Sequence, residues 1–347
     1  GWIVLAVAML VHICTAPGQT YGISIFNPYF REELGLSASQ LGGAYMAATL
    51  LAGLPLTLVG AMMDRYGTRF ALLITTLLLG LTCFAVSRVV GFWSLFLVFF
   101  CLRFIAQGSM SLLAANTLAM WFSRRLGIAS GLSNMGMAVS FGLIPPLNLF
   151  LIEIYGWRIT YILLGVGVCA ILLPLLLLLY RNRPEEMGLN IDGATTPPEA
   201  AESLEQPKVD HSFTLRQAMC TRSFWLLAAV MSSWSMTSTG VQFEMVSLFQ
   251  GRGLGVADAV RAFTIFAAIQ AASHPVAGYL ADRIPLNLML SIGVVCLAAG
   301  TGFINALPAH LMAYCFPAAL AIGSGLTMAV SETIWVRYYG RGHIGKI

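Results

Sequence analysis

The sequence predicts an all-α polytopic membrane protein, because apolar runs of twenty or more residues recur along it and charged residues are rare. Of its 347 residues, 58% are hydrophobic and 10% are charged, whereas about a quarter are charged in soluble domains. Each run is long enough to cross a hydrocarbon core of about 30 Å. Backbone polar groups in lipid must pair within one segment or in a closed barrel. The runs lack the alternation over roughly ten residues that barrel strands show, so helices are expected.

Ten helices are predicted, in two sets that a polar stretch separates. The first set is 2–26, 39–62, 69–90, 92–120, 126–151 and 157–180, and the second is 222–248, 256–282, 286–306 and 310–336. The stretch between them is rich in Pro, Glu and Ala, which favours a solvated linker. We therefore expect an N-terminal six-helix bundle (1–180), a cytoplasmic linker (181–221) and an incomplete C-terminal bundle of about four helices (222–347), in a chain that is a fragment.

Composition excludes several classes of function. The net charge is +4, and the basic residues occur singly or in pairs, which argues against a nucleic-acid partner. The seven cysteines are scattered, mostly inside apolar runs, so no disulfide, metal site or other cofactor is expected. No G-x-x-x-x-G-K-[ST] loop occurs, which argues against ATP hydrolysis. The expected partners are the lipid bilayer and a small-molecule solute, and we expect a monomer.

The distribution of basic residues predicts the orientation in the membrane. If residue 1 enters from the cytoplasm, thirteen Lys and Arg residues fall on the cytoplasmic side and five on the opposite side. Cytoplasmic loops carry the excess of these residues. We therefore expect residue 1 and the linker to be cytoplasmic, in a plasma (inner) membrane.

A short polar motif occurs twice, between the second and third helices and between the eighth and ninth. Each residue of the second copy follows its counterpart by 218 positions: Gly60 and Gly278, Asp64 and Asp282, Arg65 and Arg283. This repetition is typical of a duplicated six-helix unit in one orientation. Glycine would let neighbouring helices approach closely, and the carboxylate would accept from N–H groups at a helix start. A plain polar loop between helices would explain one copy but not two.

The first copy continues through Gly67 and Arg69, and its pattern G-x-x-x-D-R-x-G-x-R resembles the signature loop of the major facilitator superfamily. Other segments are similar to the branch that contains monocarboxylate and oxalate/formate carriers: Gly1-Trp2, the run from Trp121 to Gly127, Gly156-Trp157-Arg158, the run from Arg183 to Gly188, and Phe224-Trp225. The resemblance implies two six-helix bundles, a conformational role for the loop, and an eleventh helix after residues 338–343.

Arg103 lies about eleven residues into the fourth predicted helix. A charge there costs about 2.5 to 3.5 kcal/mol on insertion scales, so it is expected to face a cavity or a partner. With Gly108 it resembles the superfamily's fourth-helix R-x-x-x-x-G element, which implies a role in coupling and transport. Pairing with carbonyls of a neighbouring helix is the alternative. Polar residues expected to line the same cavity, or to bond between helices, are Gln19, Tyr21, Asn116, Asn134 and Gln270.

Three further ionisable residues are candidates for carrying a coupling proton. Glu244 lies in the outer half of the seventh predicted helix and Glu332 in the inner half of the tenth. Burial would raise the pKa of a carboxyl group toward neutrality, although either residue could instead be an interfacial carboxylate. His12 titrates near neutral pH, and the alternative for it is a hydrogen-bonded packing role.

His274 and Gln270 depart from the carrier branch that the chain resembles. Those carriers typically have Arg, which binds the substrate carboxylate, at the position of His274, and often Asp at the position of Gln270. A permanent cation is thus replaced by a titratable group and an acid by an amide. A protonated His274 would still hold an anion.

The sequence as a whole favours a secondary active transporter that moves a small solute, an organic anion such as a carboxylate, by alternating access, with possible proton coupling. A membrane enzyme should show paired carboxylates, a His-rich metal set or a Ser/His arrangement at the membrane face, and the sequence shows none. A transport-dead membrane sensor with the same fold is the other alternative.

Overall fold

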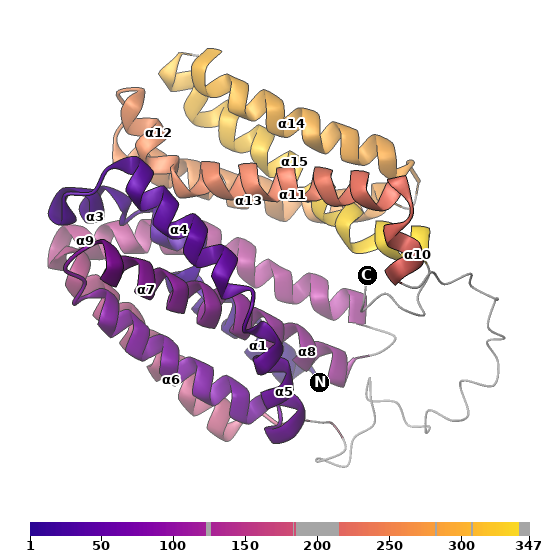
Figure 1. Cartoon of the computed structure of the whole chain (residues 1–347), viewed down its shortest axis with the longest axis horizontal. Coiled ribbons are helices and arrows are strands. Elements are labelled where there is room, and N and C mark those ends of the chain that lie inside the picture. Colours follow the sequence, from indigo (N-terminus) through magenta and orange to yellow (C-terminus); the bar gives the residue numbers. More distant parts are fainter. Residues whose placement is uncertain (123–125, 183, 185–214, 282, 307, 340–347) are drawn as a thin grey trace. The chain divides into compact units, whose positions relative to one another are not determined.

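The computed structural model describes residues 1–122, 126–182, 184, 215–281, 283–306 and 308–339, and every element in these ranges is helical. The chain forms two compact units, Gly1–Pro197 and Pro198–Ile347, called unit 1 and unit 2 here. In Figure 1, α1 to α9 belong to unit 1 and α10 to α15 to unit 2. Most of the predicted linker, 181–221, lies outside the described residues.

The first span of unit 1 is broken, where one helix over 2–26 was predicted. It consists of α1 (Trp2–Cys14), the single 3₁₀ turn η1 (Ala16–Gly18) and α2 (Thr20–Ser24). Pro17 lies in the turn, and Gln19 after it has extended backbone (φ −82°, ψ 150°). Proline has no N–H to continue the hydrogen-bond ladder, so the chain restarts its helix at Thr20.

The short helix α3 (Asn27–Leu34) was not predicted, because its residues are polar and charged rather than apolar. Pro28 stands in its first turn, and Gly35 ends it in the left-handed conformation (φ 64°), the usual pair of start and stop residues. A capping box between Ser37 and Gln40 then begins α4 (Ala38–Ala52). The span continues, after a turn at Gly53 to Pro55, as α5 (Leu56–Tyr66).

The remaining helices of unit 1 are α6 (Thr68–Val86), α7 (Phe92–Leu102), the π-helical segment η2 (Arg103–Met110), α8 (Ser111–Trp121) and α9 (Leu126–Leu178). Gly156, with φ 76° and ψ 161°, interrupts α9 and separates the predicted fifth and sixth helices. The core is aromatic at one end of the unit, where Phe30 contacts Phe99, Trp157 and Tyr161.

Unit 2 contains α10 (Leu215–Met219), α11 (Arg222–Phe243), α12 (Met245–Gly251), α13 (Val256–Ala281), α14 (Leu286–Ala306) and α15 (Ala309–Tyr339). The predicted helix 222–248 is therefore divided at Glu244. Helix α15 packs against both α13 and α14. A buried cluster that includes Ala277, Met289 and Val330 holds these three helices together.

Eight of the described segments are long and apolar enough to cross a membrane. The prediction of ten differs from this in two places. It divided 126–178 into two helices, whereas Gly131–Leu178 stands among the eight as one segment. It also included α11, whose second half is rich in Ser and Thr and which is not among the eight.

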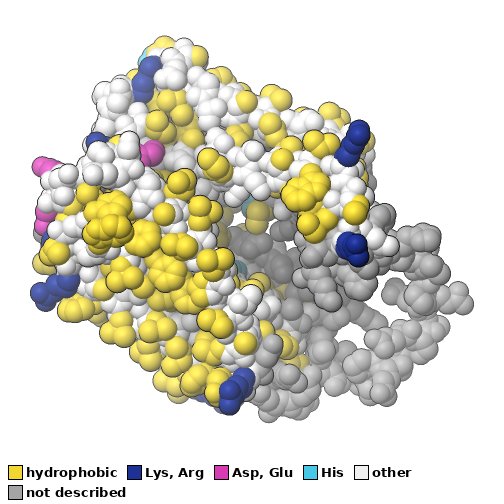
Figure 2. Space-filling model, viewed as in Figure 1, with side chains coloured by type: hydrophobic (Ala, Val, Ile, Leu, Met, Phe, Trp, Pro, Cys, Tyr) yellow, Lys and Arg dark blue, Asp and Glu magenta, His cyan; other side chains and the backbone are white. Residues whose placement is uncertain are grey.

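Large apolar side chains remain exposed on the outside of unit 1, as expected where lipid replaces water as the solvent. Leu50, Leu54 and Leu58 are 70%, 72% and 68% exposed, and Trp93 is 78% exposed. Figure 2 shows hydrophobic side chains over much of the visible face of this unit.

A polar cluster joins three segments at the end of unit 1 that carries α3. Arg158 donates to Glu33 Oε1 (2.9 Å) and to the carbonyls of Ser87 (2.6 Å) and Val89 (2.9 Å). The Trp157 indole donates to the other oxygen of Glu33. These bonds tie α3 to the segment after α6 and to the start of the helix that follows Gly156.

This cluster predicts an acid-sensitive contribution to stability. The Trp157 indole and, next, the Arg158 guanidinium hold the pKa of Glu33 below its usual range. Ionised Glu33 stabilises the fold at pH values above about 4.3, the pKa of a Glu side chain in an unfolded chain. This stabilisation is lost as the pH falls through the lower pKa that Glu33 has in the folded protein. Glu33→Gln is expected to lower the thermal midpoint at pH 7, and the loss in the free energy of unfolding should be less than about 1 kcal/mol because the pair is exposed. At pH 3 the difference from wild type should disappear.

The control for this experiment is Glu32→Gln, because Glu32 is an exposed neighbour on the same helix. It should leave the midpoint unchanged at both pH values. If the thermal midpoints of wild type and Glu33→Gln differ by the same amount at pH 3 and at pH 7, the ionised Glu33 carboxylate does not stabilise the fold as assigned.

Candidate functional site

The break in the first span and the π-helical segment η2 meet face to face in unit 1. A Cβ on Gly18 would lie 2.4 Å from the Leu102 carbonyl oxygen and 2.6 Å from Ala106 Cβ. Only glycine permits this contact between the two backbones. π-Helical turns occur often at functional sites, and here Arg103 is the first residue of the segment.

The Arg103 guanidinium is held by weak, neutral contacts. Its Nη1 lies 3.5 Å from the Gly18 carbonyl oxygen and 3.4 Å from Thr20 Oγ1. Its Cζ lies 5.1 Å from the centre of the Tyr45 ring, within the range of a cation–π interaction. The Thr20 and Tyr45 hydroxyls are 2.8 Å apart. The broken first span, α4 and η2 thus converge on one cation.

The charge of Arg103 has no carboxylate partner in the part of the chain that the structure describes. Its side chain is buried, with 5% of the residue exposed, and its Nε has no hydrogen-bond partner there. The two ion pairs among the described residues are Arg158–Glu33 and Arg261–Asp258. A buried cation without a partner is costly. Such a group is suited to receive an anion.

The Gln19 side chain bonds within the first span and not to Arg103. Its Nε2 donates to Thr15 Oγ1 (3.0 Å), and Thr15 in turn donates to the His12 carbonyl (2.7 Å). Gln107 of η2 has a buried Oε1 without a partner among the described residues. Gln107 therefore offers a second polar group within one turn of Arg103.

His12 and Tyr21 both join the first span to α9. His12 Nδ1 lies 3.0 Å from Ser133 Oγ, and the Tyr21 hydroxyl donates to Ser140 Oγ at 2.7 Å. Both side chains are buried. These contacts fit the packing alternative that the sequence left open for each of them.

Asn116 is not brought to Arg103. Its Nδ2 lies 3.4 Å from Met63 Sδ, which places it between α8 and α5. Thirteen residues of helix separate it from Arg103, or about 20 Å along the axis. The side chain of Asn134 lies outside the described residues.

The signature loop joins the start of α6 to the end of α9. Arg69 Nε donates to the Leu176 carbonyl (2.9 Å), and its Nη2 donates to the Leu177 carbonyl. The Arg69 backbone N–H donates to Asn182 Oδ1 (2.8 Å). Arg69 thereby pairs carbonyls that a helix end leaves without partners.

The glycine that the geometry requires in this loop is Gly67. It has φ 84° and ψ 158°, and a Cβ there would lie 3.0 Å from the Asn182 amide. Close helix contact was expected at Gly60 and Gly278 instead, and this was wrong, since a Cβ at either would meet no atom within 4 Å.

In each copy of the motif, the arginine that follows the aspartate lies over the ring of a nearby tyrosine. Arg65 Cζ is 5.2 Å from the Tyr66 ring centre, and Arg283 Cζ is 4.2 Å from that of Tyr279. The Asp64 side chain and Asp282 lie outside the described residues.

Gly67→Ala is expected to destabilise the protein. Its backbone region is nearly exclusive to glycine, and a residue held there costs on the order of 1–3 kcal/mol. The matched control is Gly60→Ala, in open space inside α5, which should be neutral or slightly stabilising. Thermal unfolding of both variants in the same detergent checks this, and equal midpoints would contradict it.

In unit 2 a polar row lies between α13 and α15. Gln270 Nε2 donates to Ser324 Oγ (3.0 Å), and Ser273 Oγ lies 3.4 Å from the Ala321 carbonyl oxygen. His274 is half-buried, and its Nε2 has no hydrogen-bond partner among the described residues. This buried nitrogen therefore has an unused hydrogen-bonding position.

The two acidic candidates of unit 2 differ in what the structure describes. Glu244 forms the junction between α11 and α12 and is half-buried. It stands at the end of α11. The side chain of Glu332 lies outside the described residues.

Comparison with known proteins identifies the family. The family model of the Major Facilitator Superfamily matches residues 8–347. The chain belongs to this superfamily. The superfamily and the relatives found are transporters and not enzymes, so this chain is an integral membrane protein of a transporter superfamily, and the resemblance found in the signature loop is confirmed.

Two curated relatives of the superfamily cover most of the chain. An uncharacterized MFS-type transporter, YhjX of Escherichia coli K12, is 22% identical over 340 residues, covering 95% of this chain and 79% of that protein. The oxalate:formate antiporter of Oxalobacter formigenes is 24% identical over 310 residues, 86% of this chain and 68% of that protein. The chain also matches three further curated transporters, and the matches cover 33%, 35% and 34% of their lengths.

A solved structure of the superfamily supports the fold. The E. coli xylose transporter XylE, in a partially occluded inward open conformation, aligns with a TM-score of 0.69 at 16% identity. The alignment covers 96% of this chain and 87% of XylE. At this identity the likeness concerns the all-helical fold of the superfamily, and it says nothing of the solute.

Proposed function

We propose that this chain is a secondary active transporter that carries a small organic anion, such as a carboxylate, by alternating access and with proton coupling. The observation that carries the proposal is the buried Arg103 cation, which has no carboxylate partner among the described residues. An anionic solute would supply the missing charge and the charge-assisted hydrogen bonds that guanidinium groups favour.

The names of several relatives agree with an anionic solute. They include an oxalate:formate antiporter, a probable sulfoacetate transporter and monocarboxylate transporter 11. A hexuronate transporter and a probable L-galactonate transporter are also named for acids. The proposal extends this chemistry to the present chain through Arg103, and through His274 as a second, titratable contact.

The proposal includes a topology. Residue 1 and the linker 181–221 are placed on the cytoplasmic side of an inner membrane, because the basic residues divide thirteen to five. The domains are a six-helix bundle over 1–180 and a second bundle over 222–347, with about ten spans in total. The break at Gly156 and the 22-residue length of α11 support this count.

A thermal-shift screen of the purified protein against small carboxylates across pH would identify the solute. A carboxylate that binds should raise the unfolding midpoint, since a ligand that binds the folded state stabilises it by mass action. If no member of the panel shifts the midpoint at any pH, the anionic solute class is wrong. Shifts without saturable uptake would favour the transport-dead sensor instead.

His274→Ala is expected to weaken the binding of that carboxylate by about tenfold at pH 5.5 and to flatten the pH dependence of its affinity. A protonated imidazole donates a charged hydrogen bond, worth about 1.5–3 kcal/mol, and this bond is lost as the ring deprotonates at higher pH. The control is His310→Ala, an exposed histidine at the start of α15. Unchanged affinity together with an unchanged pH profile in His274→Ala would remove this residue from the site.

A further inference from the structure

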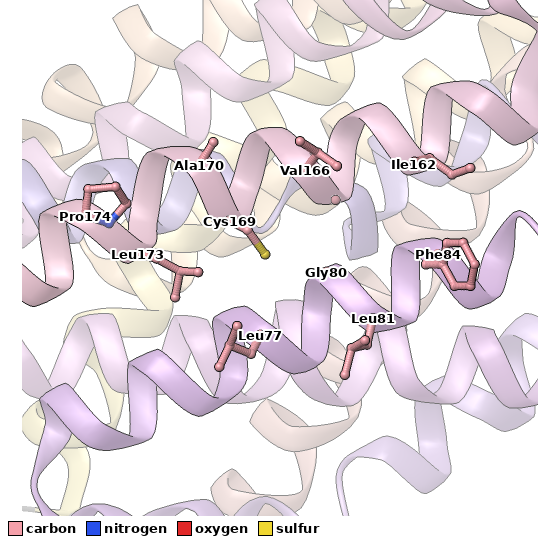
Figure 3. Close-up of a pocket in the computed structure, with 11 residues that line it drawn as sticks. Leu77, Gly80, Leu81, Phe84, Ile162, Val166, Cys169, Ala170, Leu173 and Pro174 are labelled. Atoms are coloured by element: carbon pink, nitrogen blue, oxygen red, sulfur yellow. The ribbon is translucent and has the colours of Figure 1, made fainter.

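An apolar groove runs along the outside of unit 1, between α6 and the part of α9 that follows Gly156 (Figure 3). Its volume is about 680 Å³, and apolar residues and glycines form its lining. Several of these side chains are exposed, including Leu81 at 65% and Val166 at 60%. The groove therefore opens outward, where lipid surrounds the bundle.

The groove exists because α6 and α9 cross at a pair of glycines. A Cβ on Gly165 would lie 2.8 Å from Cys83 Cβ and 3.1 Å from the Gly80 carbonyl oxygen. A Cβ on Gly80 would lie 2.5 Å from Cys169 Sγ. The backbones approach closely at this crossing, and both glycines line the groove. Figure 3 shows Cys169 pointing from α9 toward Gly80 of α6.

The dimensions of the groove suit a linear apolar ligand. From Ile162 to Pro174 it extends along twelve residues of α9, or about 18 Å at the rise of a helix. One leaflet of the hydrocarbon core is about 15 Å thick. The groove is therefore long enough to hold an acyl chain that spans one leaflet.

A cation stands at one end of the groove. Phe84 lines the groove, and Arg88 Cζ lies 5.3 Å from the centre of its ring. Arg88 is exposed and follows the end of α6 at Val86, so it lies beyond the apolar span. Among the described residues no carboxylate lies within ion-pair distance of it, since Glu33, at the same end, pairs with Arg158.

We propose that this groove binds an anionic phospholipid, with one acyl chain between α6 and α9 and the phosphate at Arg88. The guanidinium would donate to the phosphate oxygens, a pairing that its planar fork favours. Arg158, whose charge is paired with Glu33, fixes the backbone around Arg88, because it donates to the carbonyls of Ser87 and Val89 on either side of it. Bound lipid would cover the glycine crossing from outside.

The test measures the binding of phosphatidylglycerol and phosphatidylcholine to the purified, delipidated protein by native mass spectrometry. Arg88→Gln should weaken the binding of phosphatidylglycerol about fivefold, the factor that corresponds to about 1 kcal/mol per cation near an anionic lipid surface. The binding of phosphatidylcholine should weaken less, because its choline cation offsets the charge of its phosphate. The charge control is Arg261→Gln, an exposed arginine of α13 in unit 2, which should change neither affinity.

A second variant tests the groove itself. Ala170→Trp fills it from an exposed lining position and should reduce the binding of both lipids. The size control is Ala85→Trp, exposed on α6 but outside the lining, which should leave binding unchanged. If Ala170→Trp does not fold, Val166→Trp replaces it. Unchanged phosphatidylglycerol binding in either Arg88→Gln or the groove-filling variant would overturn the proposal. A dimer that only the groove-filling variant dissociates would make the groove an interface between copies and would also overturn it.

Discussion

Arg103→Gln is expected to weaken the binding of the transported anion by at least about 30-fold and to abolish its uptake. Loss of one partner of a buried charge pair costs on the order of 2–5 kcal/mol. In the protein without solute, the same change removes a buried cation that has no carboxylate partner among the described residues. The thermal midpoint of the unliganded variant should therefore be equal to or above that of wild type.

Two variants isolate the role of the charge. Arg103→Lys keeps the cation but loses the planar donor set, so intermediate affinity is expected. Arg261→Gln removes an exposed arginine whose side chain is 73% accessible and paired with Asp258, and it should leave both affinity and uptake unchanged. Uptake at the wild-type rate by Arg103→Gln would show that the anion does not bind here.

Gly18→Ala is expected to destabilise the protein by about 1–3 kcal/mol, the usual range for overpacking, and to weaken anion binding with it. The new methyl group would lie 2.4 Å from the carbonyl oxygen of Leu102, which is backbone and cannot rotate away. The two segments would have to separate. Because the Gly18 carbonyl is itself a contact of Arg103, the guanidinium would move with them.

The matched control is Gly43→Ala in α4, where a Cβ would meet no atom within 4 Å. Alanine should be neutral or slightly stabilising there, because it favours helix more than glycine does. Thermal unfolding and anion affinity are measured on both variants. If both keep the wild-type midpoint and affinity, the close contact between η1 and η2 is not part of the site.

Hydropathy was sufficient to locate most spans, because an apolar run long enough to cross the bilayer has few alternatives to a helix. It could not locate the breaks inside spans. Pro17 marked one of them, but the π-helical segment that begins at Arg103 leaves no clear sign in the sequence. Helix α3 was missed because the prediction followed apolar runs, and Asn27–Leu34 is polar.

The candidate site was predicted in part. The cost of a charge in an apolar span was enough to single out Arg103. Thr20 and Tyr45 were not chosen, because their contact with Arg103 depends on how α2 and α4 pack against η2. In the signature loop the repeated pattern led us to expect the structural role at Gly60, which the second copy also has as Gly278. Only the backbone angles show that Gly67 is the one that requires glycine.

The most direct test of the account is the initial rate of uptake of a radiolabelled carboxylate into proteoliposomes that contain the purified protein, with and without an inward proton gradient. We predict uptake that saturates with carboxylate concentration, increases with the gradient and is lost in Arg103→Gln. Uptake no faster than in protein-free liposomes, for a carboxylate that binds the protein, would contradict it.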